Sequence, residues 1–109
     1  MTKKQTAARV ALIKKLVAVA CGVTVRDING ESHLAPIVKA RHISMLFVRE
    51  TLGLSYPEIA PLFGYTNHTT ILYGCTKLLD RCSTDKALAQ FVAALFASIN
   101  ATPNRKLKP

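Results

Sequence analysis

The amino-acid sequence predicts an all-α fold, a compact helical domain that contains a helix-turn-helix. Apolar residues recur at three- and four-residue steps along most of the chain, which is the period of an α-helix. No segment alternates apolar and polar residues in the way a half-buried strand does. Glycines 22, 53 and 64 stand where the helical patterns stop, as expected of residues that end helices.

Length and composition favour a single domain. A chain of 109 residues can bury one hydrophobic core but not two of comparable size. Half of the residues are apolar, which argues against intrinsic disorder. We therefore expect one domain over residues 1–109, with an ordered core at about 7–100 and a flexible basic tail at 101–109.

The first helix is expected from about Thr6 to Ala20, with Gly22 as its stop. Its apolar positions define one face, and Lys14 and Lys15 fall between them. A brief helical turn capped by Thr24 should follow, before a turn and a loop at 29–35.

The central helix is expected from Pro36 to the residue before Gly53. Proline suits the first turn of a helix, and the apolar residues that follow occupy most sides of it, which is typical of a buried helix. Three basic residues are its expected exposed positions: Lys39, Arg41 and Arg49.

A short capped helix and a glycine turn follow. Ser55 and Glu58 have the spacing of a capping box, and Pro57 is tolerated in a first turn. Gly64 can adopt the positive φ that a sharp exit from a helix requires. The apolar positions expected to face inward are Ile59, Leu62 and Phe63.

The next helix begins with the polar residues Asn67 and His68. Its expected core face comprises Ile71, Leu72, Cys75, Leu78 and Leu79. Its expected outer face comprises Thr69, Thr70, Tyr73, Thr76 and Lys77. A last helix, from about Thr84 to Ile99, should bury Leu88, Val92, Leu95, Phe96 and Ile99.

The net charge of +9 favours a polyanionic partner, either nucleic acid or an anionic membrane surface. The most hydrophobic stretch, residues 16–25, is too short to span a bilayer, and no secretory signal is evident. The apolar face of the first helix is explained more simply as core than as a membrane-binding face. We therefore expect a cytoplasmic, nucleoid-associated protein with no membrane partner.

Residue types that would support catalysis or metal binding are scattered. Cys21, Cys75 and Cys82 form no Cys-x-x-Cys pair, and no histidine has a second ligand at metal spacing. No nucleophile-base-acid set or phosphate-binding glycine loop is visible. We expect no enzyme activity, no metal and no cofactor.

The polar turn at 67–70 is the candidate DNA-reading element. At the start of a recognition helix, short polar side chains reach base edges while free amides approach phosphate. Asparagine can pair with adenine, and threonine methyls can pack on thymine. The basic residues expected on phosphates are Lys39, Arg41, Arg49 and Lys77. The same polar run can also serve only as a helix cap.

The motif Ser55-Tyr56-Pro57-Glu58-Ile59, then Leu62-Phe63-Gly64, then Asn67-His68-Thr69-Thr70-Ile71-Leu72 and Lys77-Leu78, resembles the carboxy-terminal DNA-binding domain of the bacterial replication initiator DnaA. A looser similarity extends from about Ile13 to Ile99. The resemblance implies an all-helical domain with a helix-turn-helix of the Trp-repressor-like class, which binds short asymmetric DnaA boxes.

By position, the resemblance implies a place at the major groove for His68, Thr69 and Thr70, with Tyr56 and Pro57 approaching the same groove. It implies positions near the DNA backbone for Arg41, His42, Arg49 and Lys77.

This sequence departs from the family at several of those positions. Asn67 stands where the family usually has Asp, a change that can shift preference from cytosine toward adenine. Tyr73 replaces a commonly smaller or histidine side chain and adds a ring that can pack on DNA or on a partner. Thr66 replaces a usually basic residue, and the loop at 29–35 has no arginine, with His33 as its remaining candidate.

We expect a stand-alone DNA-binding part, since no ATP-binding domain is present in the sequence. The predicted function is sequence-specific binding of double-stranded DNA, in replication control or transcription. The alternative is a protein-interaction module that keeps the fold and binds a replication protein or an acidic partner.

Overall fold

A computed structural model describes residues 2–101, and every regular element within that range is helical. The predicted all-α fold is confirmed. Of the predicted flexible tail, Ala101 belongs to the last helix and residues 102–109 lie outside the described range. The elements are α1 (Lys3–Cys21), α2 (Val25–Asn29), α3 (Ala35–Leu52), α4 (Tyr56–Ile59), the 3₁₀ helix η1 (Ala60–Phe63), α5 (Thr69–Thr84) and α6 (Lys86–Ala101).

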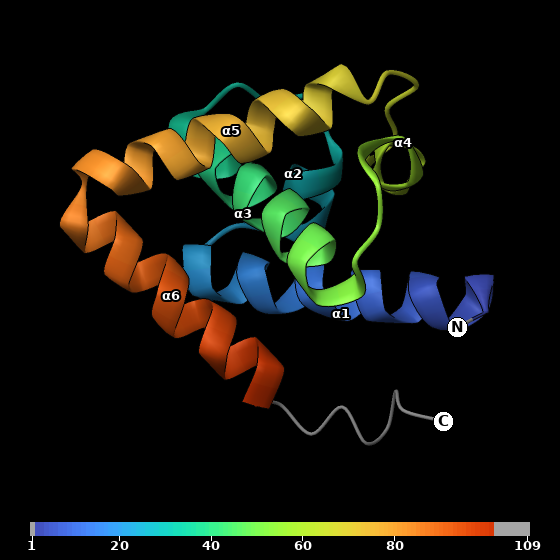
Figure 1. Ribbon diagram of the computed structural model, residues 1–109, viewed down its shortest axis with the longest axis horizontal. Coiled ribbons are helices and arrows are strands. Elements are labelled where there is room, and N and C mark those ends of the chain that lie inside the picture. Colours follow the sequence, from blue (N-terminus) through green and yellow to red (C-terminus); the bar gives the residue numbers. More distant parts are fainter. Residues whose placement is uncertain (1, 102–109) are drawn as a thin grey trace.

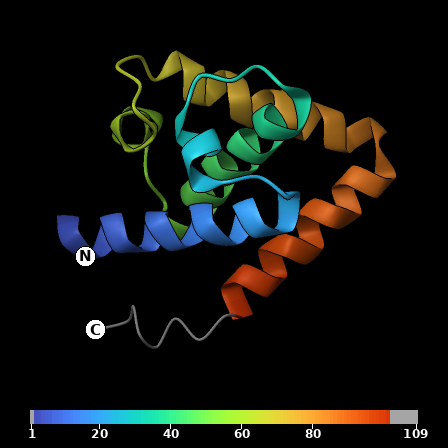
Figure 2. The ribbon, with the colours of Figure 1, turned by 180° about the vertical axis from the view of Figure 1, so that it is seen from behind.

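Helix α3 lies at the centre of the molecule, between α1 on one side and α5 on the other (Figure 1). Helix α6 runs from the end of α5 back toward α1, and it contacts α1, α3 and α5. The reverse view shows the loop before α3 passing beside α5 (Figure 2). The side chains of Ile43, Phe47 and Val48 are almost completely buried, which confirms that α3 is the buried central helix.

Local capping signals define where most helices begin and end. Thr2 forms a capping box with Gln5, so α1 begins at Lys3 rather than near Thr6 as expected. Thr24 forms a second capping box with Asp27, and this confirms the predicted short helix. Gly22 has a φ of 70°, a left-handed conformation that glycine adopts without steric cost.

Lys14 is buried between α1 and the helix-turn-helix, with only 6% of its surface exposed. Its ammonium donates hydrogen bonds to Asn29 Oδ1 at 2.7 Å and to the Leu62 carbonyl at 2.5 Å. The ammonium also lies 4.3 Å from the centroid of the Phe63 ring. Burial lowers the pKa of Lys14 from 10.5 to about 8.

The core face of α5 is narrower than expected. Ile71, Cys75 and Leu78 are buried as predicted, but Leu72 and Leu79 are 41% and 53% exposed. These two leucines flank the buried row and remain partly open to solvent. In α6, Leu95 and Phe96 are half-buried rather than fully buried.

Helices α3 and α5 approach each other closely at Gly74. A Cβ atom at this position would lie 2.9 Å from both His42 Cδ2 and Met45 Sδ. The absence of a side chain at Gly74 therefore permits the observed packing, which sets the position of α5 on the core. Within residues 2–101, no helix combines the length and apolar character needed to cross a membrane.

Candidate nucleic-acid interface

The first helix of the predicted helix-turn-helix is formed by α4 and η1. The Ser55 amide donates to Glu58 Oε1 at 2.9 Å, and the Glu58 amide donates to Ser55 Oγ at 3.3 Å, so the predicted capping box is present. Gly64 ends η1 with a φ of 82°. Ile59 and Phe63 are buried as predicted, while Leu62 is half-buried. The result is a short helix anchored on the core, followed by a sharp turn into α5.

The recognition turn, defined here as Asn67–Thr70, leads into the first turn of α5. Asn67, His68 and Thr69 are exposed, and Thr70 is half-buried. The Thr69 amide donates to Asn67 Oδ1 at 2.8 Å, so Asn67 acts as a local cap. A carbonyl oxygen has two acceptor sites and the side-chain amide two donors, so this cap leaves Asn67 able to pair with a base.

Tyr56 and Pro57 lie at the start of α4, and Arg49 of α3 holds this segment in place. The Arg49 guanidinium stacks 4.0 Å from the centroid of the Tyr56 ring, and its Nη1 donates to the Leu54 carbonyl at 3.1 Å. Arg49 is therefore half-buried rather than fully exposed. It retains further N–H groups that can reach a phosphate. Pro57 is exposed beside it.

Arg41 differs most from its predicted environment. It was expected to be exposed, but only 6% of its surface is accessible. Its guanidinium donates three hydrogen bonds of 2.9 Å, to the carbonyls of Asp27, Ile28 and Ser32. A guanidinium can satisfy several carbonyls at once because its donors spread in a planar fork. In this structure Arg41 ties α2 and the following loop to α3.

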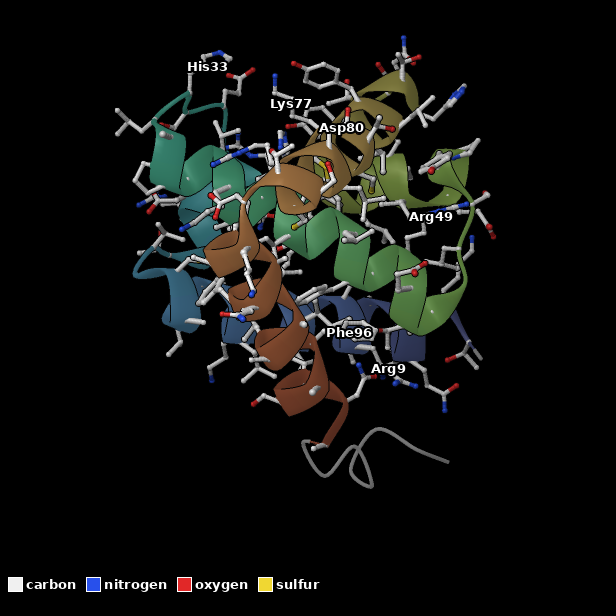
Figure 3. The ribbon with its side chains drawn as sticks, turned by 60° about the vertical axis from the view of Figure 1, so that its left-hand side comes forward. Arg9, His33, Arg49, Lys77, Asp80 and Phe96 are labelled. Atoms are coloured by element: carbon white, nitrogen blue, oxygen red, sulfur yellow. The ribbon has the colours of Figure 1, made fainter. Side chains whose placement is uncertain are left out.

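A groove with a volume of about 350 Å³ lies beside the recognition turn, between the loop before α3, α3 itself and α5. We call it the basic groove, because five of its lining side chains carry nitrogen: His33, Arg41, His42, Lys77 and Arg81. Figure 3 shows His33 and Lys77 on the same side of the molecule. Thr70 and Tyr73 also line the groove, which makes it continuous with the recognition turn.

His42 is half-buried in the basic groove. Its ring meets Tyr73 edge-on, with the centroids 6.4 Å apart. Burial lowers the pKa of His42 below its ordinary value, and the positive charges of Arg41, Arg81 and Lys77 lower it further. The groove therefore carries a positive potential even with His42 neutral.

Lys39 does not line the basic groove. Its ammonium sits 5.4 Å from the centroid of the Phe91 ring on α6, and it lines a different cavity. Arg81 lines both that cavity and the basic groove, and it had not been predicted as a site residue. The sequence contains one signal for it, since Arg81 follows Lys77 by four residues and thus shares its helical face.

The cysteines are free thiols. Cys75 is buried, which raises its pKa to about 11, and Cys21 and Cys82 are half-buried. In the described part of the chain, no group of three or more His, Cys, Asp or Glu side chains could hold a metal ion.

The sequence of this chain is similar to those of known proteins. Residues 10–78 match a family described as the bacterial DnaA protein helix-turn-helix. Similar proteins include the chromosomal replication initiator protein DnaA of Picosynechococcus, 35% identical over 89 residues, which are 82% of this chain and 20% of that protein. The protein of the same name from Roseiflexus castenholzii is 39% identical over 83 residues, or 76% and 17% of the two chains. The one from Nostoc punctiforme is 36% identical over 99 residues, or 91% and 22%. This chain thus spans about a fifth of the length of the curated relatives it matches.

Proposed function

This chain belongs to the bacterial DnaA helix-turn-helix family, and from this premise we propose that it binds double-stranded DNA in a sequence-specific manner, as a non-enzymatic module in the control of replication. The observation that carries the proposal is the exposed recognition turn at the start of α5, mounted on a capped helix that the core holds in place. Such a protein would act on the nucleoid in the cytoplasm.

In the proposed complex the recognition turn enters the major groove. His68 and Thr69 then face the base edges, with the Thr69 methyl suited to the methyl of thymine. Asn67 presents an amide to the same groove, a pattern complementary to adenine. Tyr56 and Pro57 approach from the first helix.

Phosphate contacts fix the orientation of the protein without reading sequence. Lys77, Arg49 and His42 are the side chains of the predicted set that remain accessible near the recognition turn. Arg41 has a different role from these phosphate-binding side chains. It fixes the loop that carries His33, and thereby shapes the surface that the DNA meets.

Selection of bound sequences from random duplex DNA, repeated at two salt concentrations, tests the proposal. We expect an enriched motif whose affinity falls with salt. His68→Ala and Thr69→Ala should each reduce affinity for that motif, while Thr76→Ala, a matched exposed position farther along α5, should not. Binding without any enriched motif would reduce the function to non-specific phosphate contact, and no binding would refute it.

A second candidate function, binding to a replication protein, has one observation in its favour. Leu79 is 53% exposed beside an apolar groove of about 250 Å³ between α3, α5 and α6, which Leu46, Val92 and Phe96 also line. Exposed apolar surface beside a groove is typical of protein interfaces. If Leu79→Ala abolishes binding of a replication protein while His68→Ala has no effect on any DNA tested, this second function replaces the first.

A further inference from the structure

We infer that the basic groove holds a backbone phosphate of the bound DNA, with Arg81 and Lys77 as its ligands, so that the DNA contact extends along α5 beyond the recognition turn. This inference rests on the proposed DNA binding. It adds Arg81 to the interface, a residue beyond the segment 10–78 that the family description covers.

The side chains that line the groove favour an anionic ligand. Nitrogen-bearing side chains enter it from three segments: His33 from the loop, His42 from α3, and Lys77 and Arg81 from α5. No carboxylate is among its lining residues in the described part of the chain. The cations among the lining residues, Arg41 from α3 and Lys77 and Arg81 from α5, concentrate positive potential in the groove, which attracts an anion.

The two cations on α5 are available to a ligand. Lys77 and Arg81 are exposed, and within residues 2–101 neither side chain has a hydrogen-bond or ion-pair partner. Arg41, in contrast, is saturated by three carbonyls. Lys77 and Arg81 are one helical turn apart, about 6 Å along the axis. They can therefore act together on one phosphate or on two neighbouring phosphates of one strand.

The basic groove is continuous with the recognition turn. Thr70 belongs to that turn and lines the groove, and Tyr73 lies between it and Lys77 on the same face of α5. A DNA strand that leaves the recognition turn thus meets a hydroxyl, an ammonium and a guanidinium in succession. The positive charges of Lys77 and Arg81 also lower the pKa of His42 in the same groove, so their electrostatic potential extends to this residue of α3.

The chemistry of the two ligands favours phosphate over a base edge. A guanidinium binds phosphate oxygens with two parallel hydrogen bonds, and an ammonium binds them as a point charge. Each phosphate that the protein neutralises releases counterions, which adds about 0.9 to the slope of log affinity against log salt. A contact of this kind changes affinity uniformly across DNA sequences.

The test compares Arg81→Ala with Arg9→Ala. Both remove one arginine charge, but Arg9 lies on the opposite side of the molecule from Lys77 and His33 (Figure 3). We expect Arg81→Ala to weaken binding to the selected duplex several-fold and to reduce the salt slope by about 0.9, with the ranking of sequences unchanged. Arg81→Lys should retain most of the slope, and Arg9→Ala should leave both quantities unchanged. Circular dichroism should show both alanine variants folded.

A second measurement locates the phosphate. Neutral methylphosphonates are placed one at a time in the duplex, and affinity is measured for the original protein and for Arg81→Ala. We expect one position at which the neutral linkage weakens binding of the original protein but not of Arg81→Ala, as in a double-mutant cycle. If the original protein binds the duplex and Arg81→Ala has the same slope, this inference is refuted while the proposed function stands. If the original protein binds no duplex DNA, both fail.

Discussion

Lys14, in the middle of α1, donates a hydrogen bond to the carbonyl of Leu62, 48 residues farther along the chain and on the first helix of the helix-turn-helix. The same ammonium bonds Asn29 at the end of α2. One side chain thus connects three segments, and it fixes how the helix-turn-helix sits on the rest of the domain.

Replacing Lys14 by methionine should test this connection. Methionine keeps the apolar stem but removes the donor to Asn29 Oδ1, on an exposed residue, and to the carbonyl of the half-buried Leu62. A buried carbonyl left unsatisfied costs about 1–3 kcal/mol. We expect urea unfolding to show a loss in that range for Lys14→Met. The control is Lys15→Met, which is exposed and should change stability by less than about 0.5 kcal/mol. Equal stability of the two variants would contradict the role given to Lys14.

The pH dependence of stability should report the same residue. Burial lowers the pKa of Lys14 from 10.5 to about 8, so between these values the unfolded chain holds a proton that the folded chain has released. Stability attributable to Lys14 therefore rises as pH increases through that interval. The measurement is the difference in urea midpoint between the original protein and Lys14→Met, which removes the contribution of other titrating groups. A difference that stays constant from pH 8 upward would exclude this linkage.

Arg41 should contribute mainly to the stability of the fold, and not only to phosphate binding. Arg41→Met removes the donor of three hydrogen bonds to backbone carbonyls, and hydrogen bonds to charged groups contribute about 1.5–3 kcal/mol each, with incomplete additivity. We expect a loss of about 3 kcal/mol or more in the free energy of unfolding, together with faster amide exchange in the loop at 31–34. Lys77→Met removes an exposed cation that has no hydrogen-bond or ion-pair partner among residues 2–101, and it should leave stability unchanged. If Arg41→Met were as stable as the original protein and had lost only DNA affinity, the result would support the predicted contact between Arg41 and phosphate instead.

Two substitutions of Asn67 should separate its role in helix capping from its role in base reading. Asn67→Ala removes the bond to the Thr69 amide, which should cost about 1 kcal/mol of stability, whereas Asn67→Asp preserves an acceptor at this site. In a repeated selection, Asn67→Asp should shift one position of the motif from adenine toward cytosine, by roughly 1–3 kcal/mol of discrimination. An unchanged motif in both variants would mean that Asn67 only caps the helix.

The sequence predicted the features that depend on neighbouring residues. The cap at Thr24, the capping box at Ser55 and the left-handed Gly64 were correctly predicted, because each depends on residues within one helical turn. The burial of Lys14 and Arg41 could not be predicted in this way. Their carbonyl partners come from other segments, which the fold alone brings within reach. The exposure of Leu72 and Leu79 likewise depends on how much of α5 its neighbours cover.

The recognition turn is hydrogen-bonded within its own segment, whereas the helices that support it, α4 and η1, are packed into the core. The Asn67 oxygen bonds Thr69 two residues away, and no side chain of residues 67–69 bonds another element within residues 2–101. Mutations in this turn therefore carry little folding penalty beyond the local cap. A lineage of such proteins could exchange one DNA target for another in single steps, with every intermediate still folded.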